Sequence, residues 1–65
     1  MKWINEREVP NELTELLDNP ETPKGLWKEI VKARDEINDY GAVTYPTKAR
    51  VEALYHEYMV VKGNL

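Results

Sequence analysis

The sequence predicts a small all-α domain of three helices. Prolines at positions 10, 20, 23 and 46 divide the chain into a leader and three segments. In each segment apolar residues recur at intervals of three and four, which is the spacing of one helix face. We therefore expect a single domain over residues 1–65. In it, a short first helix and the N-terminal leader pack on an antiparallel hairpin of the second and third helices.

The first helix is expected over residues 10–19. Its apolar positions follow the helical spacing, with Leu13, Leu16 and Leu17 on one face, and Pro20 stops it. A helix of about two turns is not stable alone, so these leucines must dock on the rest of the domain. The leader, residues 1–9, shows neither helical nor strand periodicity. We expect its Trp3 and Ile4 to fold back over the helices.

The second helix is expected over residues 22–40 and should form the centre of the fold. Thr22 is placed to act as its N-cap, with Pro23 at the first helical position, where a missing N–H costs nothing. Gly41 follows as a left-handed C-cap. The apolar stripe is broad enough to contact two neighbours and consists of Leu26, Ile30, Ala33 and Ile37, widened by Trp27 and Val31.

The third helix is expected over residues 46–62, with Gly63 as its stop. Its apolar face carries Val51, Leu54, Tyr55, Tyr58 and Lys62, flanked by Met59. If it lies antiparallel to the second helix, Lys24 and Lys28 approach Glu57, and the charges of the two helices complement each other. Such surface pairs contribute only about 0–1 kcal/mol each, so they orient the hairpin more than they stabilise it.

Composition excludes several classes of protein. The chain has 65 residues and no cysteine, so neither disulfides nor thiolate metal sites can stabilise its thin core. Its net charge is −3, and residues 1–21 hold two basic and six acidic side chains, which does not indicate a general attraction to nucleic acid. No apolar run is long enough to span a membrane, and the charged N-terminus is not a signal peptide. We expect an intracellular, cytoplasmic protein.

The residues needed for catalysis are missing from the sequence. There is no serine or cysteine, no threonine has a base at a suitable spacing, and no glycine-rich loop could hold a phosphate. Glu52 and His56 are one helical turn apart, but two ligands do not make a metal site of useful affinity. A chain this short is also expected to lack a pocket of several hundred cubic ångströms. We expect no enzymatic activity, no cofactor and no metal.

The aromatic residues indicate a protein-binding function. Two tryptophans and four tyrosines are more than a thin core can cover, and such side chains often dominate the binding energy of interfaces. We expect a small regulator or interaction module that binds a protein partner, or a second copy of itself, through one helix face. The candidate contact residues are Trp3, Tyr55, Tyr58, Met59 and Val60.

The connection over residues 41–46 allows two interpretations. In the first it is a packed bend that holds Val43 and Tyr45 in the core. In the alternative it is the turn of a DNA-binding helix-turn-helix, and the start of the third helix reads bases through Thr47, Lys48 and Arg50. The phosphate contacts would then come from Lys24, Lys28 and Lys32. The length of the turn favours the packed bend.

Overall fold

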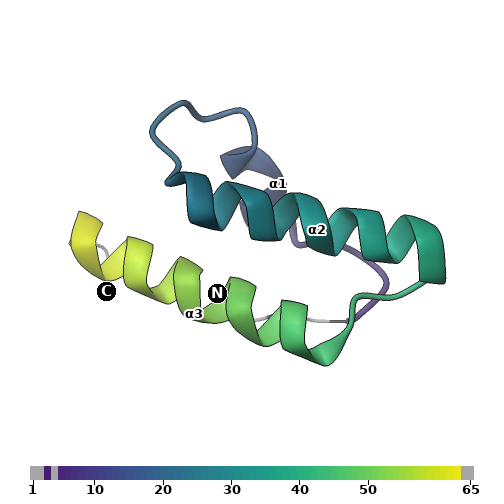
Figure 1. Ribbon diagram of the computed structural model, residues 1–65. Helices are drawn as coiled ribbons and strands as arrows, with labels where there is room; N and C mark the ends of the chain where they lie inside the picture. The colour runs from purple at the N-terminus through teal and green to yellow at the C-terminus, as the bar shows by residue number, and fades with distance from the viewer. Residues whose placement is uncertain (1–2, 4, 64–65) are drawn as a thin grey trace.

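The fold is the predicted all-α arrangement, with α2 and α3 forming an antiparallel hairpin (Figure 1). The structure is a computed structural model that describes residues 3 and 5–63. Over these residues the helices are α1 (Asn11–Leu16), α2 (Lys24–Tyr40) and α3 (Tyr45–Lys62). In the view of Figure 1 both α1 and the described part of the leader, residues 5–9, lie behind the hairpin, so they cover one of its two faces. Ile4 lies outside the described residues.

Helix α1 is shorter than the predicted 10–19, because the chain leaves the helix for a hydrogen-bonded turn after Leu16. In this turn the Thr22 hydroxyl donates to the Leu16 carbonyl at 2.7 Å, and the Asn19 side chain accepts from the Glu21 N–H at 2.9 Å. The prediction that Thr22 caps α2 was therefore wrong. Pro23 takes the N-cap position of α2 instead, without a side-chain hydrogen bond.

Both glycine C-caps predicted from the sequence are confirmed. Gly41 ends α2 with φ of +87° and donates its N–H to the Ile37 carbonyl at 2.8 Å, and Gly63 ends α3 with φ of +78°. A residue with a Cβ adopts this left-handed conformation only at a cost, which is why glycine is favoured at both positions. The hairpin bend thus begins where the sequence placed it.

The core lies between the hairpin and the elements behind it. Its buried residues come from every part of the described chain: Trp3, Leu13, Leu26, Ile30, Ala33, Val43, Val51 and Tyr58. On α2, the indole N–H of Trp27 donates to the Leu17 carbonyl at 3.2 Å and ties the end of α1 to the hairpin. Trp3 folds back as expected and is only 4% exposed, although its indole N–H finds no hydrogen-bond partner among the described residues.

The connection between α2 and α3 is a packed bend, held by the carboxylate of Glu36. One oxygen of Glu36 accepts from the Thr44 N–H at 2.8 Å and from the Thr44 hydroxyl at 2.9 Å. The other accepts from the Thr47 hydroxyl at 2.8 Å. Val43 is buried and donates its N–H to the Glu6 carbonyl at 2.8 Å. Tyr45, expected in the core, is instead 79% exposed, because it begins α3 on the side away from α2.

These hydrogen bonds also fix the protonation of Glu36. Partial burial acts to raise the pKa of its carboxyl group, but the hydrogen bonds from the Thr44 backbone and from the hydroxyls of Thr47 and Thr44 act in the opposite direction. With the positive charge of Lys32 nearby, the net effect is a pKa below the ordinary value. Glu36 therefore holds the bend as a carboxylate.

The ion pair between the two long helices is not the one predicted. Arg50 contacts Glu29 at 3.2 Å, whereas no ion pair joins Lys24 or Lys28 to Glu57 within the described part of the chain. The antiparallel packing itself is confirmed. The charges of Lys24, Lys28 and Glu57 thus remain available on the surface.

Candidate functional site

The five residues predicted to bind a partner do not form one exposed patch. Trp3 and Tyr58 belong to the core, with 4% and 9% of their surface exposed, and Tyr55 and Met59 are half-buried. Only Val60 is well exposed, at 52%. In so small a domain the core needs the aromatic side chains of α3 to cover it, and this leaves few of them for a partner.

The middle of α3 instead faces α1 across a hollow of about 280 Å³. Tyr55, Tyr58 and Met59 line it together with the acidic residues Glu12 and Glu15. Burial, followed by the nearby charge of Glu12 and by Tyr58, raises the pKa of the Tyr55 hydroxyl. These side chains join α3 to α1, and their role here is to close the domain.

The Tyr58 side chain is held at both ends. Its ring belongs to the core, and its hydroxyl accepts a hydrogen bond from Lys62 Nζ at 3.3 Å. The same ammonium group lies 5.2 Å from the centre of the ring, within the range of a cation–π contact. Only one edge of Tyr58 is left at the surface.

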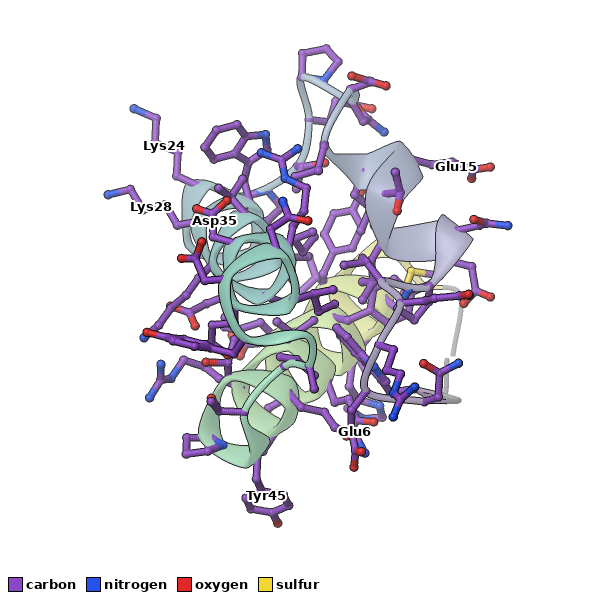
Figure 2. The ribbon with its side chains drawn as sticks, turned by 90° about the vertical axis from the view of Figure 1, so that its right-hand side faces the viewer. Glu6, Glu15, Lys24, Lys28, Asp35 and Tyr45 are labelled. Atoms are coloured by element: carbon purple, nitrogen blue, oxygen red, sulfur yellow. The ribbon has the colours of Figure 1, made fainter. Side chains whose placement is uncertain are left out.

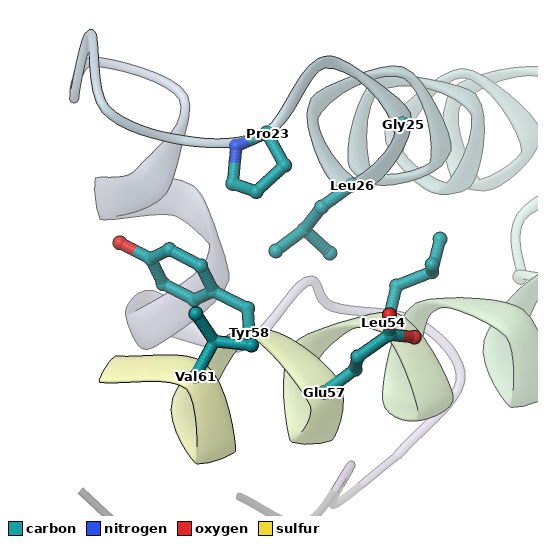
Figure 3. A pocket seen from close by; sticks show the side chains of 7 residues that line it. All are labelled: Pro23, Gly25, Leu26, Leu54, Glu57, Tyr58 and Val61. Carbon is teal, nitrogen blue, oxygen red and sulfur yellow. The ribbon is translucent and has the colours of Figure 1, made fainter. Parts of the chain in front are cut away.

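That edge contributes to an apolar groove between the start of α2 and the end of α3 (Figure 3). Leu26 on α2 points toward Tyr58 and Leu54 on α3, and Val61 lies beside Tyr58. The groove has a volume of about 190 Å³ and is lined by Pro23, Gly25, Leu26, Leu54, Glu57, Tyr58 and Val61. None of these residues comes from α1 or the leader, so the groove belongs to the hairpin alone.

Two features of the sequence form this groove. Gly25 has no side chain, and a Cβ built on it would meet nothing within 4 Å, so its wall of the groove is open. The last two turns of α3 are apolar on more than one side, because Val60 and Val61 follow each other directly. Two adjacent residues of a helix point about 100° apart, so they cannot both face the same core. Val61 consequently lies at the groove with 81% of its surface exposed.

Sequence reasoning missed Val61 and found only its neighbour. Val60 was among the candidate contact residues, but the adjacent pair Val60–Val61 was the stronger signal. An α-helix that is apolar all round is normally covered on all sides. Here α1 and the leader cover one face of the hairpin, and the groove lies on the other.

Charge is distributed unequally over the two faces of the molecule. Lys24 and Lys28 project from the face that α1 leaves uncovered, while Glu15 projects on the opposite side (Figure 2). The acidic side chains of the leader, α1 and the following turn are all exposed, and they are Glu6, Glu8, Glu12, Glu15, Asp18 and Glu21. The uncovered face therefore carries Lys24 and Lys28 on α2 and, within the lining of the groove, Glu57 on α3.

The residues of the DNA-binding alternative are not presented together. Thr47 is 1% exposed and its hydroxyl donates to Glu36. Arg50 pairs with Glu29, and Lys48 is half-buried. On α2, all three predicted phosphate-binding residues are exposed: Lys24, Lys28 and Lys32. The start of α3, which would read bases, is thus occupied by contacts within the chain.

Two further features lie near the leader, a second hollow and Glu52. A hollow of about 360 Å³ lies between the leader, α1 and α2, larger than expected for this chain, and its lining includes Glu8, Thr14 and Arg34. Glu52 accepts the Trp3 N–H at 3.4 Å, which turns it toward the leader. Among residues 3 and 5–63, no group of three or more His, Cys, Asp or Glu side chains could hold a metal ion.

Comparison of the chain with protein-family models, curated proteins and solved structures gives no match. No helix within the described ranges is both long enough and apolar enough to cross a membrane. Any function must therefore be inferred from the chain's own surface.

Proposed function

We propose that this chain is a small non-enzymatic protein-interaction module that binds its partner through the apolar groove between α2 and α3. The observation that carries the proposal is Val61, which is 81% exposed beside a groove whose other walls are almost wholly apolar. Contact of apolar surface with water is unfavourable, so a partner that covers this surface lowers the free energy. The proposal thus assigns partner binding to Val61 and the groove, in place of the core residue Tyr58.

The residues that line the groove indicate how much binding free energy a partner could gain. Full burial of a valine side chain is worth about 1.5–3 kcal/mol, and Val61 is mostly exposed before binding. Leu54 is half-buried and would add a smaller amount. Binding would order few side chains, because Leu26 and Tyr58 are already held in the core. A preformed groove of this kind keeps the entropic cost of association low.

Photocrosslinking in the cells that make the protein tests the proposal. A benzophenone amino acid replaces Val61 in one variant and His56 in a matched control, since His56 is exposed on α3 but does not line the groove. We expect a crosslinked protein from position 61 and much less from position 56. No product from position 61, or equal products from both positions, would overturn the proposal.

A further inference from the structure

We propose that the partner in the groove is a second copy of this chain, and that two hairpins stack face to face as an antiparallel four-helix bundle. The inference rests on the proposed binding role of the groove and names its occupant. In this dimer the two-fold axis runs along the groove, parallel to the helices. Each α2 then lies over the α3 of the other copy, and neighbouring helices are antiparallel throughout the bundle.

The two-fold rotation places positive side chains of one copy opposite negative side chains of the other. Lys24 and Lys28 project from α2 on the face that α1 leaves uncovered (Figure 2), and Glu57 lines the groove on the α3 side of the same face. Gly25 and Val61 line the same groove, so the start of α2 and the end of α3 are at the same level along the hairpin. A two-fold axis along the groove therefore brings Lys28 of each copy to Glu57 of the other. A partner surface with charges of only one sign would be repelled either by the lysines of α2 or by Glu57 of α3.

Gly25 supports a close approach of two helices. Within the chain nothing lies within 4 Å of a Cβ placed there, so the fold gives no packing reason for glycine. A glycine in a helix costs up to about 1 kcal/mol relative to alanine. An α3 helix of a second copy that crosses near Gly25, with Val61 at the contact, would use the missing side chain.

The uncovered face is large enough for a stable dimer. The molecule measures 34 × 20 × 18 Å between Cα atoms, so a face of the hairpin is on the order of the ~800 Å² that each partner buries in a specific interface. A domain of this length also has little core of its own, and small domains often gain stability by association. The dimer would cover the end of α3 on the side that α1 leaves bare.

Light scattering and sedimentation of the full chain provide the first test. The wild-type protein should have twice the monomer mass of 7.6 kDa at ~100 µM, and Val61→Glu should weaken association at least ~10-fold. Val60→Glu is the matched control: it places the same charge on the adjacent, exposed residue of the same helix turn, outside the groove lining. It should remain dimeric. Circular dichroism establishes that both variants keep their helices.

A charge exchange tests the orientation of the two copies. Lys28→Glu and Glu57→Lys should each weaken the homodimer, because each sets like charges across both borders of the groove. An equal mixture of the two variants should form a heterodimer, since both borders then pair opposite charges. Failure of the mixture to associate more tightly than either variant alone would overturn the proposed arrangement.

The two proposals can fail separately. A monomeric wild-type chain at ~100 µM, together with a heavier crosslinked product from position 61, would overturn the dimer and leave the groove as the site for another protein. A dimer that Val61→Glu and Val60→Glu leave equally intact would place the interface elsewhere and overturn the inference. A monomer without any crosslink would overturn both proposals.

Discussion

Replacing Glu36 with alanine should destabilise the domain more than any other single change on the polar side of α2. The carboxylate accepts three hydrogen bonds from Thr44 and Thr47. A hydrogen bond to a charged group contributes about 1.5–3 kcal/mol, but Thr44 is exposed and water can replace its bonds. The Thr47 hydroxyl is 1% exposed and has no such replacement. We therefore expect a loss of about 2–3 kcal/mol, mostly from Thr47.

For a domain of this size that loss corresponds to a fall in Tm of about 8–24 °C. Thermal and urea unfolding followed by circular dichroism measure it, with Asp35→Ala as the control. Asp35 is the adjacent α2 residue and is exposed. Its change to alanine gains more helix propensity than that of Glu36, but only by about a few tenths of a kcal/mol, well below the expected loss. A double-mutant cycle with Thr47→Val should show coupling between the two sites above about 1 kcal/mol. Equal stability of Glu36→Ala and Asp35→Ala would refute the assignment of the bend to Glu36.

Acidification should remove the stabilising contribution of the Glu36 carboxylate. The pKa of Glu36 is lower in the folded chain than its ordinary value, so its stabilising effect is fully present above the unfolded-state pKa. It is lost as the pH falls through the folded-state pKa, because the carboxyl group then takes up a proton that weakens the bonds from Thr44 and Thr47. The difference in unfolding free energy between the wild type and Glu36→Gln should therefore shrink from about pH 6 to about pH 3. A difference that stays constant over this range would contradict the lowered pKa.

The other stability predictions concern the ends of helices. Trp27→Phe should cost about 0.5–1.5 kcal/mol through loss of the bond to the Leu17 carbonyl, and hydrogen exchange should quicken in α1 while α3 is unchanged. Exchange that quickens equally in α1 and α3 would show that Trp27 does not hold α1 specifically. Gly41→Ala should cost about 1–2 kcal/mol, since φ is +87° there. Gly25→Ala, in a helix with open space around its Cα, should be neutral or stabilising under conditions where the chain is monomeric, and equal Tm shifts for the two glycines would contradict this.

Much of the fold follows from local features of the sequence. Helical spacing of apolar residues gave the three helices, and the two glycine caps were placed correctly because a left-handed residue has a strong local preference for glycine. The end of α1 was less well predicted. Thr22 was expected to cap α2, but its hydroxyl bonds back across the turn to Leu16. Capping and turn formation use the same hydroxyl, and sequence alone does not decide between them.

The tertiary structure determines which residues are left exposed as a binding site, because the leader and all three helices contribute side chains to one small core. Trp3 and Tyr58 read equally well as core or contact residues, and only the path of the leader and the position of α1 bury them. Nothing in the sequence indicated that Glu36 would bind Thr44 and Thr47, because these hydroxyls reach its carboxylate only once the bend has formed.

The sequence by itself determined the helical class, the antiparallel hairpin and the left-handed caps, because spacing and backbone preference act over a few residues. The tertiary structure decided which face of the hairpin stays uncovered. That choice leaves Val61 exposed and Gly25 open, since one short α1 can cover only one side of two long helices.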